Sequence, residues 1–250
     1  MPDALGAALA APGLIWLALT FLIAGLVRGF TGFGTALIFM PVGAALLTLP
    51  LAVAVLAVVD LIAQPLILPR AWRKADRRQV GVLVLAALIG APIGVWMLTW
   101  VDDAALRWGV ALVAAATLAA LVSGWRYRGR VGKPGLAGIG AASGIVGGAT
   151  GLAGPPVILF YLAGQVAAAS VRANTILFLA AVDVVILVNL FLAGLVGAQA
   201  VVLAAVLLVP YGAGLLVGQR LFDPAYERTF RAAAYLVIAG AIVAGLPLFG

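Results

Sequence analysis

Apolar segments long enough to enter a lipid bilayer follow one another along almost the whole of this chain. Of its 250 residues, 66% are hydrophobic and 9% are charged, whereas about 25% of the residues in a soluble domain are charged. The apolar segments leave no room for a soluble domain or a long linker. The sequence therefore predicts an all-α polytopic membrane protein, a single transmembrane domain over residues 1–250 whose function lies among its spans.

Two glycine-rich motifs present the same features in the same order. The first, Gly29–Gly34, reads Gly-Phe-Thr-Gly-Phe-Gly, and the second, Gly148–Gly154, reads Gly-Ala-Thr-Gly-Leu-Ala-Gly. An acid follows each motif at the end of an apolar run, at Asp60 and at Asp183. A duplicated unit that places glycine-rich breaks and acids inside apolar segments is typical of secondary transporters.

The two copies of the repeat cover about residues 12–124 and 134–250. Apolar stretches of about 15 residues flank each motif, and at 1.5 Å per residue such a stretch covers about 22 Å, less than the ~30 Å hydrocarbon core. Each motif is therefore predicted to form a broken or re-entrant helix pair inside the membrane, followed by three full spans, about eight to ten transmembrane segments in all. The predicted stretches are 13–27, 35–49, 51–69, 80–101 and 104–123, then 135–147, 155–166, 174–196, 198–219 and 230–249.

The positive residues predict how the copies are oriented. Two basic loops hold Arg70, Arg73, Lys74, Arg77 and Arg78, and Arg126, Arg128, Arg130 and Lys133. An excess of Lys and Arg beside a span marks the cytoplasmic side, so both loops are predicted to be cytoplasmic and the turn at Asp102 to be outside. The equivalent turn of the second copy, at Asp223, lies between Arg220 and Arg228, which favours the cytoplasm. The two copies are therefore predicted to have inverted topology, with both termini outside.

Composition excludes several kinds of function. The chain has no Cys and no His, which excludes disulfides, thiol redox chemistry, imidazole catalysis and typical zinc sites. We predict no cofactor and no metal. The net charge of +7 comes largely from the basic loops, so nucleic acid is not a predicted partner, although binding of anionic lipid or RNA is the competing interpretation of these loops. The start of the chain lacks a basic region, which predicts a retained first span in place of a cleaved signal peptide.

The segments Arg28–Pro41 and Ser143–Pro156 resemble the TauE/SafE family of membrane permeases, the sulfite-exporter-like group. Each matches the family's Gly-Phe-Gly-Gly-Gly-type signature followed by Pro, and the resemblance covers nearly the whole chain. The chain departs from the signature at Thr35, at Ala36 and at Ala153. The resemblance implies a multi-pass transporter in the inner membrane of a bacterium, not an enzyme. Its implied cargo is sulfite, sulfoacetate or a related sulfonate or carboxylate.

Arg28 is the predicted centre of an anion site, because it lies beside the first motif and a guanidinium matches sulfonate or carboxylate oxygens. Helix N-termini near Thr35 and Pro155 would add N–H groups and a positive dipole end. The predicted substrate-binding residues are Arg28, Thr31, Gly32, Phe33, Gly34, Thr150, Gly151, Gly154, Arg172 and Asn174. The structural alternatives are that Arg28 pairs with Asp60, that the threonines cap helices, that the glycines only pack helices, and that Arg172 is a topology charge.

Asp60, Asp183 and Gln64 are the predicted ion-coupling residues. Both acids lie near the middle of apolar segments, where a carboxyl that loses its hydration suits reversible protonation or Na⁺ binding. We predict a proton in preference to sodium, and we favour Asp60 because Gln64, one turn away, adds polarity to the same face. The alternative is a structural salt bridge to Arg28 or to Arg172. No P-loop is present, so transport would use an ion gradient or run downhill.

Two other classes of function are kept open. An intramembrane aspartyl hydrolase would also carry two acids on two helices, but it would need them to share a proton. A non-transporting subunit of a membrane complex would have little use for duplicated polar sites in the bilayer. A homodimer is compatible with the transporter interpretation, whose predicted partners are a small anion, the lipid bilayer and a coupling ion.

Overall fold

The computed structural model describes residues 6, 8–11, 13–124, 131–163, 168–221 and 227–246, and the regular structure of this part of the chain is helical. The predicted all-α class is confirmed. The helices are α2 (Leu14–Thr31), α3 (Thr35–Leu46), α4 (Leu49–Ala63), the 3₁₀ helix η1 (Gln64–Leu66), α5 (Leu68–Lys74), α6 (Arg77–Trp100), α7 (Asp103–Val122), α8 (Lys133–Thr150), α9 (Gly154–Ala163), α10 (Ala168–Leu192), α11 (Ala198–Leu221) and α12 (Glu227–Ala244).

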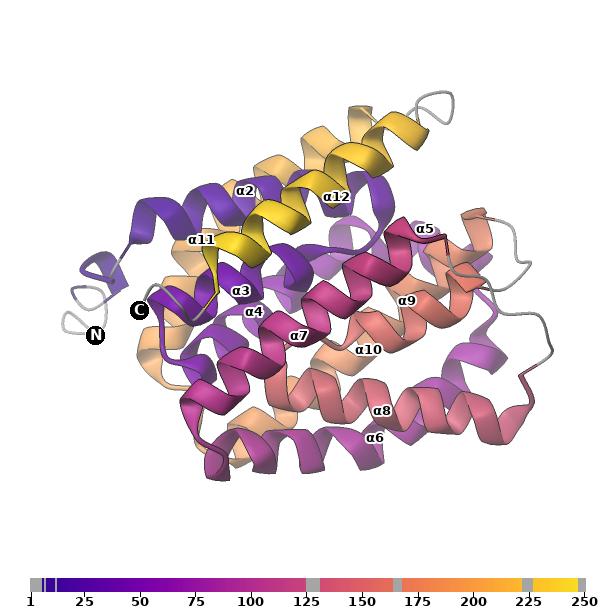
Figure 1. Cartoon of the computed structure of the whole chain (residues 1–250), viewed down its shortest axis with the longest axis horizontal. Helices are drawn as coiled ribbons and strands as arrows, with labels where there is room; N and C mark the ends of the chain where they lie inside the picture. Colours follow the sequence, from indigo (N-terminus) through magenta and orange to yellow (C-terminus); the bar gives the residue numbers. More distant parts are fainter. Residues whose placement is uncertain are drawn as a thin grey trace.

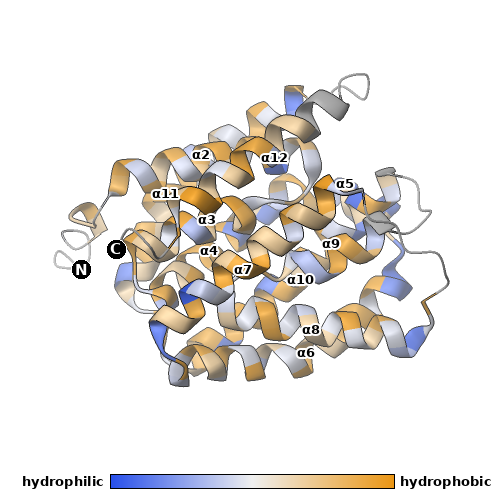
Figure 2. Cartoon of the chain, viewed as in Figure 1, coloured by the Kyte–Doolittle hydropathy of each residue, from blue (hydrophilic) through white to orange (hydrophobic). Residues whose placement is uncertain are grey.

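Six helical segments in the described part of the chain are long and apolar enough to cross a membrane. They are Leu14–Thr31, Leu49–Leu66, Arg77–Trp100, Asp103–Val122, Ala169–Leu192 and Ala198–Leu221. Hydrophobic colouring runs along the length of the helices in Figure 2, and α6 exposes the large side chains of Leu85, Ile89 and Trp100. A soluble protein rarely leaves so much apolar surface uncovered, so these faces suit contact with lipid.

Both predicted breaks are interruptions between two helices, but each is shorter than predicted. The first covers residues 32–34, between α2 and α3, and the second covers residues 151–153, between α8 and α9. Gly32 ends α2 with φ 82° and Gly151 ends α8 with φ 75°, a left-handed conformation that glycine adopts without steric cost. Gly29 and Gly148, predicted to belong to the breaks, lie instead inside α2 and α8.

Gly29 and Gly148 are helical because each lets its helix pack directly on the backbone of another. A Cβ atom on Gly29 would lie 2.6 Å from Leu215 O of α11, and a Cβ atom on Gly148 would lie 2.6 Å from Ala91 O of α6. Contacts advance along both partners in the same direction, so α2 runs parallel to α11 and α8 runs parallel to α6. In Figure 1, α2 lies along the upper edge and the α6–α8 pair along the lower edge, with α3, α4, α7, α9 and α10 between them.

The predicted span 51–69 is interrupted before its end. α4 ends at Ala63 and a 3₁₀ turn follows at Gln64–Leu66, because Pro65 and Pro69 supply no backbone N–H to continue an α-helix. The first predicted basic loop is therefore mostly helical, within α5 and the start of α6. Arg126, Arg128 and Arg130 of the second basic loop, and Asp223 of the predicted cytoplasmic turn, lie outside the described residues.

Candidate functional site

The two breaks meet at one small, partly open cavity. Its volume is about 20 Å³, which is room for roughly one water molecule. The cavity is lined by residues of five helices and of both breaks: Arg28, Gly34, Thr35, Ala36, Leu37, Asp60, Gly151, Ala153, Gly154, Pro155, Ile158, Leu179 and Asp183. Motifs more than a hundred residues apart in the sequence thus contribute to the same polar interior.

A buried ion pair forms one wall of this cavity. Arg28 is 2% exposed and its Nη1 donates to Asp60 Oδ2 at 2.7 Å. The same nitrogen lies 3.3 Å from Thr35 Oγ1, and Tyr211 of α11 donates its hydroxyl to Asp60 Oδ1 at 2.6 Å. Thr35 Oγ1 and the Tyr211 hydroxyl are 3.0 Å apart and complete a closed polar ring. The ring fixes the position of the guanidinium and occupies both oxygens of Asp60.

The other edge of the Arg28 guanidinium has no protein partner among the described residues. Its Nε and Nη2 atoms are both buried and form no hydrogen bond. A buried guanidinium with unused donors is costly unless a ligand or water binds it. Because Nε and Nη2 present two N–H groups side by side, this edge matches two oxygens of one carboxylate, sulfite or sulfonate.

The N-terminus of α3 opens onto the same cavity. Gly34, Thr35, Ala36 and Leu37 line it, and no side chain caps this end of the helix. The first N–H groups of a helix have no partner within the helix and carry partial positive charge, which favours an anion. α9 also begins at the cavity, but Pro155 and Pro156 provide no N–H there. The first break therefore offers more donors than the second.

The two acids at the cavity differ in their partners. Asp60 is 5% exposed and paired with Arg28, whereas Asp183 of α10 is partly exposed and accepts from Gln64 Nε2 at 3.0 Å. Asp60 thus has the salt bridge that the sequence offered as its structural alternative, and by the same criterion Asp183 is the better candidate for reversible protonation. The described residues hold no group of three or more acidic side chains arranged to bind a metal ion.

Four of the predicted ligands serve the backbone of the breaks. Thr31 Oγ1 donates to Val27 O and accepts from Phe33 N, and Thr150 Oγ1 makes the equivalent bonds to Val146 O and from Leu152 N. The cavity lining includes Gly34, Gly151 and Gly154. It does not include the other four predicted ligands, Thr31, Gly32, Phe33 and Thr150. The threonines therefore have the capping role that the sequence allowed as their alternative.

Arg172 and Asn174, also predicted as ligands, lie away from the cavity and tie α10 to other elements. Arg172 Nη2 donates to Gly29 O at 2.7 Å, which holds the end of α2. Asn174 Oδ1 accepts from the backbone N–H of Asp76 at 2.8 Å, just before α6 begins. These contacts position helices around the site.

Thr35 and Tyr211 belong to the polar ring although the sequence did not predict them as site residues. Thr35 carried a signal, because it departs from the glycine signature on which the family resemblance was based. Tyr211 carried a weaker one, as a hydroxyl beside Pro210 in the middle of an apolar helix. Its contact with Asp60 joins residues 151 positions apart, and no local pattern predicts that pairing.

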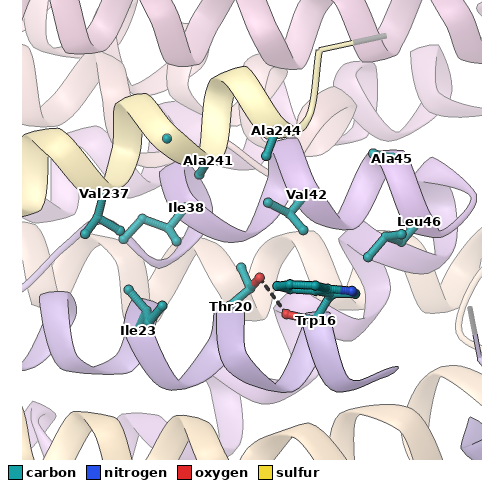
Figure 3. Close-up of a pocket in the computed structure, with 11 residues that line it drawn as sticks. Trp16, Thr20, Ile23, Ile38, Val42, Ala45, Leu46, Val237, Ala241 and Ala244 are labelled. Carbon is teal, nitrogen blue, oxygen red and sulfur yellow. Dashed lines mark hydrogen bonds between the residues drawn. The ribbon is translucent and has the colours of Figure 1, made fainter. Parts of the chain in front are cut away.

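A larger groove of about 430 Å³ lies between α2, α3 and α12, apart from the polar cavity. Figure 3 shows that its lining is almost entirely apolar, and that the Thr20 hydroxyl is already bonded to the backbone oxygen of Trp16. The groove contains no charged side chain. It lacks the donors that recognise an anion, so the smaller cavity is the candidate site.

A comparison with protein families identifies the family of the chain. The family model described as "Sulfite exporter TauE/SafE" matches residues 17–245, a range that includes both breaks and every residue lining the cavity. No significant match was found among curated proteins or among solved structures.

Proposed function

Because the chain belongs to the sulfite exporter TauE/SafE family, we propose that it is a secondary-active transporter of a small sulfur-containing anion. The proposed cargo is sulfite or a related sulfonate or carboxylate, moved across the inner membrane of a bacterium by alternating access. The observation that carries the proposal is the buried edge of Arg28, whose Nε and Nη2 have no partner among the described residues. The adjoining N-terminus of α3 adds further donors.

The size of the cavity supports a mechanism with an occluded state. At about 20 Å³ the cavity is too small for a sulfonate, although it is partly open. A substrate therefore needs the walls to separate before it can reach Arg28. Since α2, α3, α4, α9 and α10 all line the cavity, movement of some of these helices against the others would open it.

We propose that the two copies form an inverted structural repeat. Equivalent glycines make equivalent contacts: a Cβ atom on Gly29 would lie 2.8 Å from Gln219 N, and one on Gly148 would lie 2.8 Å from Val95 N. In this scheme α2, α3, α4, α6 and α7 correspond to α8, α9, α10, α11 and α12. α2 of the first copy packs on α11 of the second, while α8 of the second packs on α6 of the first, as a two-fold axis in the membrane plane requires.

The absence of cysteine allows a direct test of the inversion. Single-cysteine variants can be made at Lys74 and Lys133, proposed to face the cytoplasm, and at Val101 and Gly197, proposed to face outward. A membrane-impermeant maleimide added to intact cells should label the second pair and should label the first pair only after the cells are opened. Labelling of Lys74→Cys and Lys133→Cys on opposite sides would contradict the topology.

The contacts of the acids favour transport over the aspartyl hydrolase alternative. A hydrolytic pair of carboxyls shares a proton through a direct contact. Here Asp60 Oδ2 and Oδ1 accept from Arg28 and Tyr211, and Asp183 Oδ2 accepts from Gln64. The pairing of Asp60 with a cation supports a role in positioning Arg28.

The proposed function is tested by uptake of radiolabelled sulfite into vesicles that contain the purified protein. Arg28→Ala should abolish uptake. Arg28→Lys keeps the charge but loses the paired donors, so it should raise the sulfite concentration that gives half-maximal uptake by about tenfold or more. Arg220→Lys is the matched control, because Arg220 is exposed at the end of α11, and it should transport like the wild type. Normal uptake by Arg28→Ala, in vesicles with the same protein content, would exclude the proposed site.

A further inference from the structure

The two carboxyl groups at the cavity have different electrostatic partners. Asp60 has a permanent counter-charge in Arg28, with Asp60 Oδ2 2.7 Å from Nη1. Asp183 has a neutral partner, the amide of Gln64, and its Oδ1 accepts no hydrogen bond from the described residues. Asp183 therefore lacks the paired cation that Asp60 has, and no partner of opposite charge fixes the form of its carboxyl group.

The charges at the cavity conflict with anion binding while Asp183 is ionised. Arg28 and Asp60 cancel, so an ionised Asp183 leaves the site with one net negative charge before any substrate enters. Two like charges a few ångströms apart in a partly dry site repel enough to weaken binding by roughly a hundredfold. Neutral Asp183 removes this repulsion and leaves the free edge of Arg28 to attract the anion.

Gln64 is suited to both forms of Asp183. Its Nε2 donates to the ionised carboxylate, while its Oε1 is buried and has no partner among the described residues. Rotating the amide by half a turn would place Oε1 opposite Asp183, where it could accept a hydrogen bond only from a protonated carboxyl. The unused acceptor of Gln64 thus gains a donor when Asp183 takes up a proton.

We propose that Asp183 takes up one proton when the anion binds beside Arg28, so that proton and anion cross the membrane together. The proton comes from water on the side to which the cavity is open, attaches to a carboxyl oxygen of Asp183, and leaves on the other side with the anion. Asp60 stays paired with Arg28 throughout. This inference rests on the proposed function, because it requires the anion to bind at Arg28.

The other ionisable groups on the helices near Asp183 lie too far along those helices to take its place. Asp60 and Arg28 are the charged groups that act on it. The helices α6, α8 and α9, which also pack on α10, carry their ionisable side chains at one end only: Arg77, Arg78, Lys133 and Tyr161. The short helix α5, which packs on α10 as well, carries Arg70, Arg73 and Lys74. Proton exchange at the cavity therefore falls to Asp183.

The test compares sulfite binding by the wild type and by Asp183→Asn in detergent, by calorimetry from about pH 5 to about pH 9. Asp183→Asn imitates the protonated form, so it should bind at least as tightly as the wild type in acid. Relative to this variant, the wild type should lose affinity as the pH rises, by up to roughly tenfold for each pH unit. Sulfite itself exchanges a proton in this range, and the comparison at each pH removes that contribution. Asp103→Asn, on the exposed start of α7, is the matched control and should follow the wild type.

A second measurement uses the wild type itself. Difference infrared spectra should gain the carbonyl band of a carboxylic acid when sulfite is added, and Asp183→Glu should shift this band. An identical pH dependence in the wild type and Asp183→Asn, or a spectrum with no new band, would overturn the proton inference and leave the anion site intact. Failure of both proteins to bind sulfite at any pH would overturn the proposed site itself, and the inference with it.

Discussion

The two helix breaks share one backbone design but differ in chemistry. At the first break Thr31 accepts from the N–H of Phe33 at 3.1 Å, and at the second Thr150 accepts from the N–H of Leu152 at 3.3 Å. The glycine that follows each threonine is left-handed. Both copies therefore end a helix in the same way, with a threonine followed by a glycine, and two further residues separate that glycine from the next helix.

The side chains around this shared backbone have diverged. When Gly32 is equated with Gly151, the place of Arg28 is taken by Gly147 and the place of Thr35 by Gly154. The second break has no buried cation and no polar ring, and Ser143 closes it with a hydrogen bond to Ala153 O. Duplication has thus preserved the geometry that brings the breaks together, while among the described residues the first copy alone supplies a buried cation, the one proposed to bind the anion.

Packing explains why the second copy cannot carry a matching arginine. A Cβ atom on Gly147 would lie 2.6 Å from the Cβ of Ala153 and 2.9 Å from Ile186 Cδ1. A long side chain has no space there unless Ala153 of the break and the Ile186 side chain move. The asymmetry leaves Asp183, the equivalent of Asp60, without a cation of its own, and this makes it available to titrate.

The largest predicted effect compares the two acids in the stability of the protein. Asp60→Ala leaves Arg28 buried without a counter-charge and should lower the free energy of unfolding by about 3–5 kcal/mol. Asp183→Ala removes a group with a neutral partner and should cost about 1 kcal/mol. Unfolding in detergent, followed by circular dichroism under identical lipid content, measures both.

A double variant separates an unpaired charge from lost packing. Arg28→Met combined with Asp60→Leu removes both charges, so it should recover much of the stability that Asp60→Ala loses while transporting no sulfite. Equal losses of unfolding free energy for Asp60→Ala and Asp183→Ala would show that the two acids have the same electrostatic environment. That result would contradict the proposed difference between the two copies.

A smaller effect is expected where the copies are alike. Gly29→Ala and Gly148→Ala each place a Cβ atom 2.6 Å from a carbonyl oxygen of the neighbouring helix, so each should destabilise the protein by about 1–3 kcal/mol. Gly81→Ala and Gly138→Ala are the controls, because a Cβ atom there meets nothing within 4 Å. Both controls should be neutral or slightly stabilising, since alanine is the better helix former. A large loss at Gly29 and none at Gly148 would break the structural equivalence of the α2–α11 and α8–α6 pairs.

The sequence predicted much of the fold because local signals mark the helix ends. Apolar segments and glycines placed both breaks to within a few residues, and the pairing of Arg28 with Asp60 was foreseen as an alternative because few other partners exist for a buried charge. The separate roles of Gly29 and Gly32 were not distinguishable. A glycine that packs against a neighbouring helix and a glycine that ends its own helix look the same in the amino-acid sequence.

The parts of the site that could not be predicted depend on which helices are neighbours. Tyr211 reaches Asp60 only because α11 packs along α2. Arg172 and Asn174 lie beside the start of the predicted span 174–196, and in the fold they contact Gly29 and the residue before α6. A polar residue inside an apolar segment signals that a partner exists, but only the tertiary arrangement identifies that partner.

The smallest predicted effect tests the feature that both breaks share. Thr31→Val and Thr150→Val preserve shape but remove the oxygen that accepts the N–H two residues later, and each should cost about 1 kcal/mol of unfolding free energy. Thr20→Val is the control, because its hydroxyl only donates to a carbonyl oxygen within α2, and it should change stability by about 0.5 kcal/mol or less. Since both threonines lie outside the cavity lining, sulfite binding should persist in both variants. Loss of sulfite binding in Thr31→Val at unchanged stability would instead make Thr31 a substrate ligand, and the first break would then differ from the second in its backbone cap as well as in its charge.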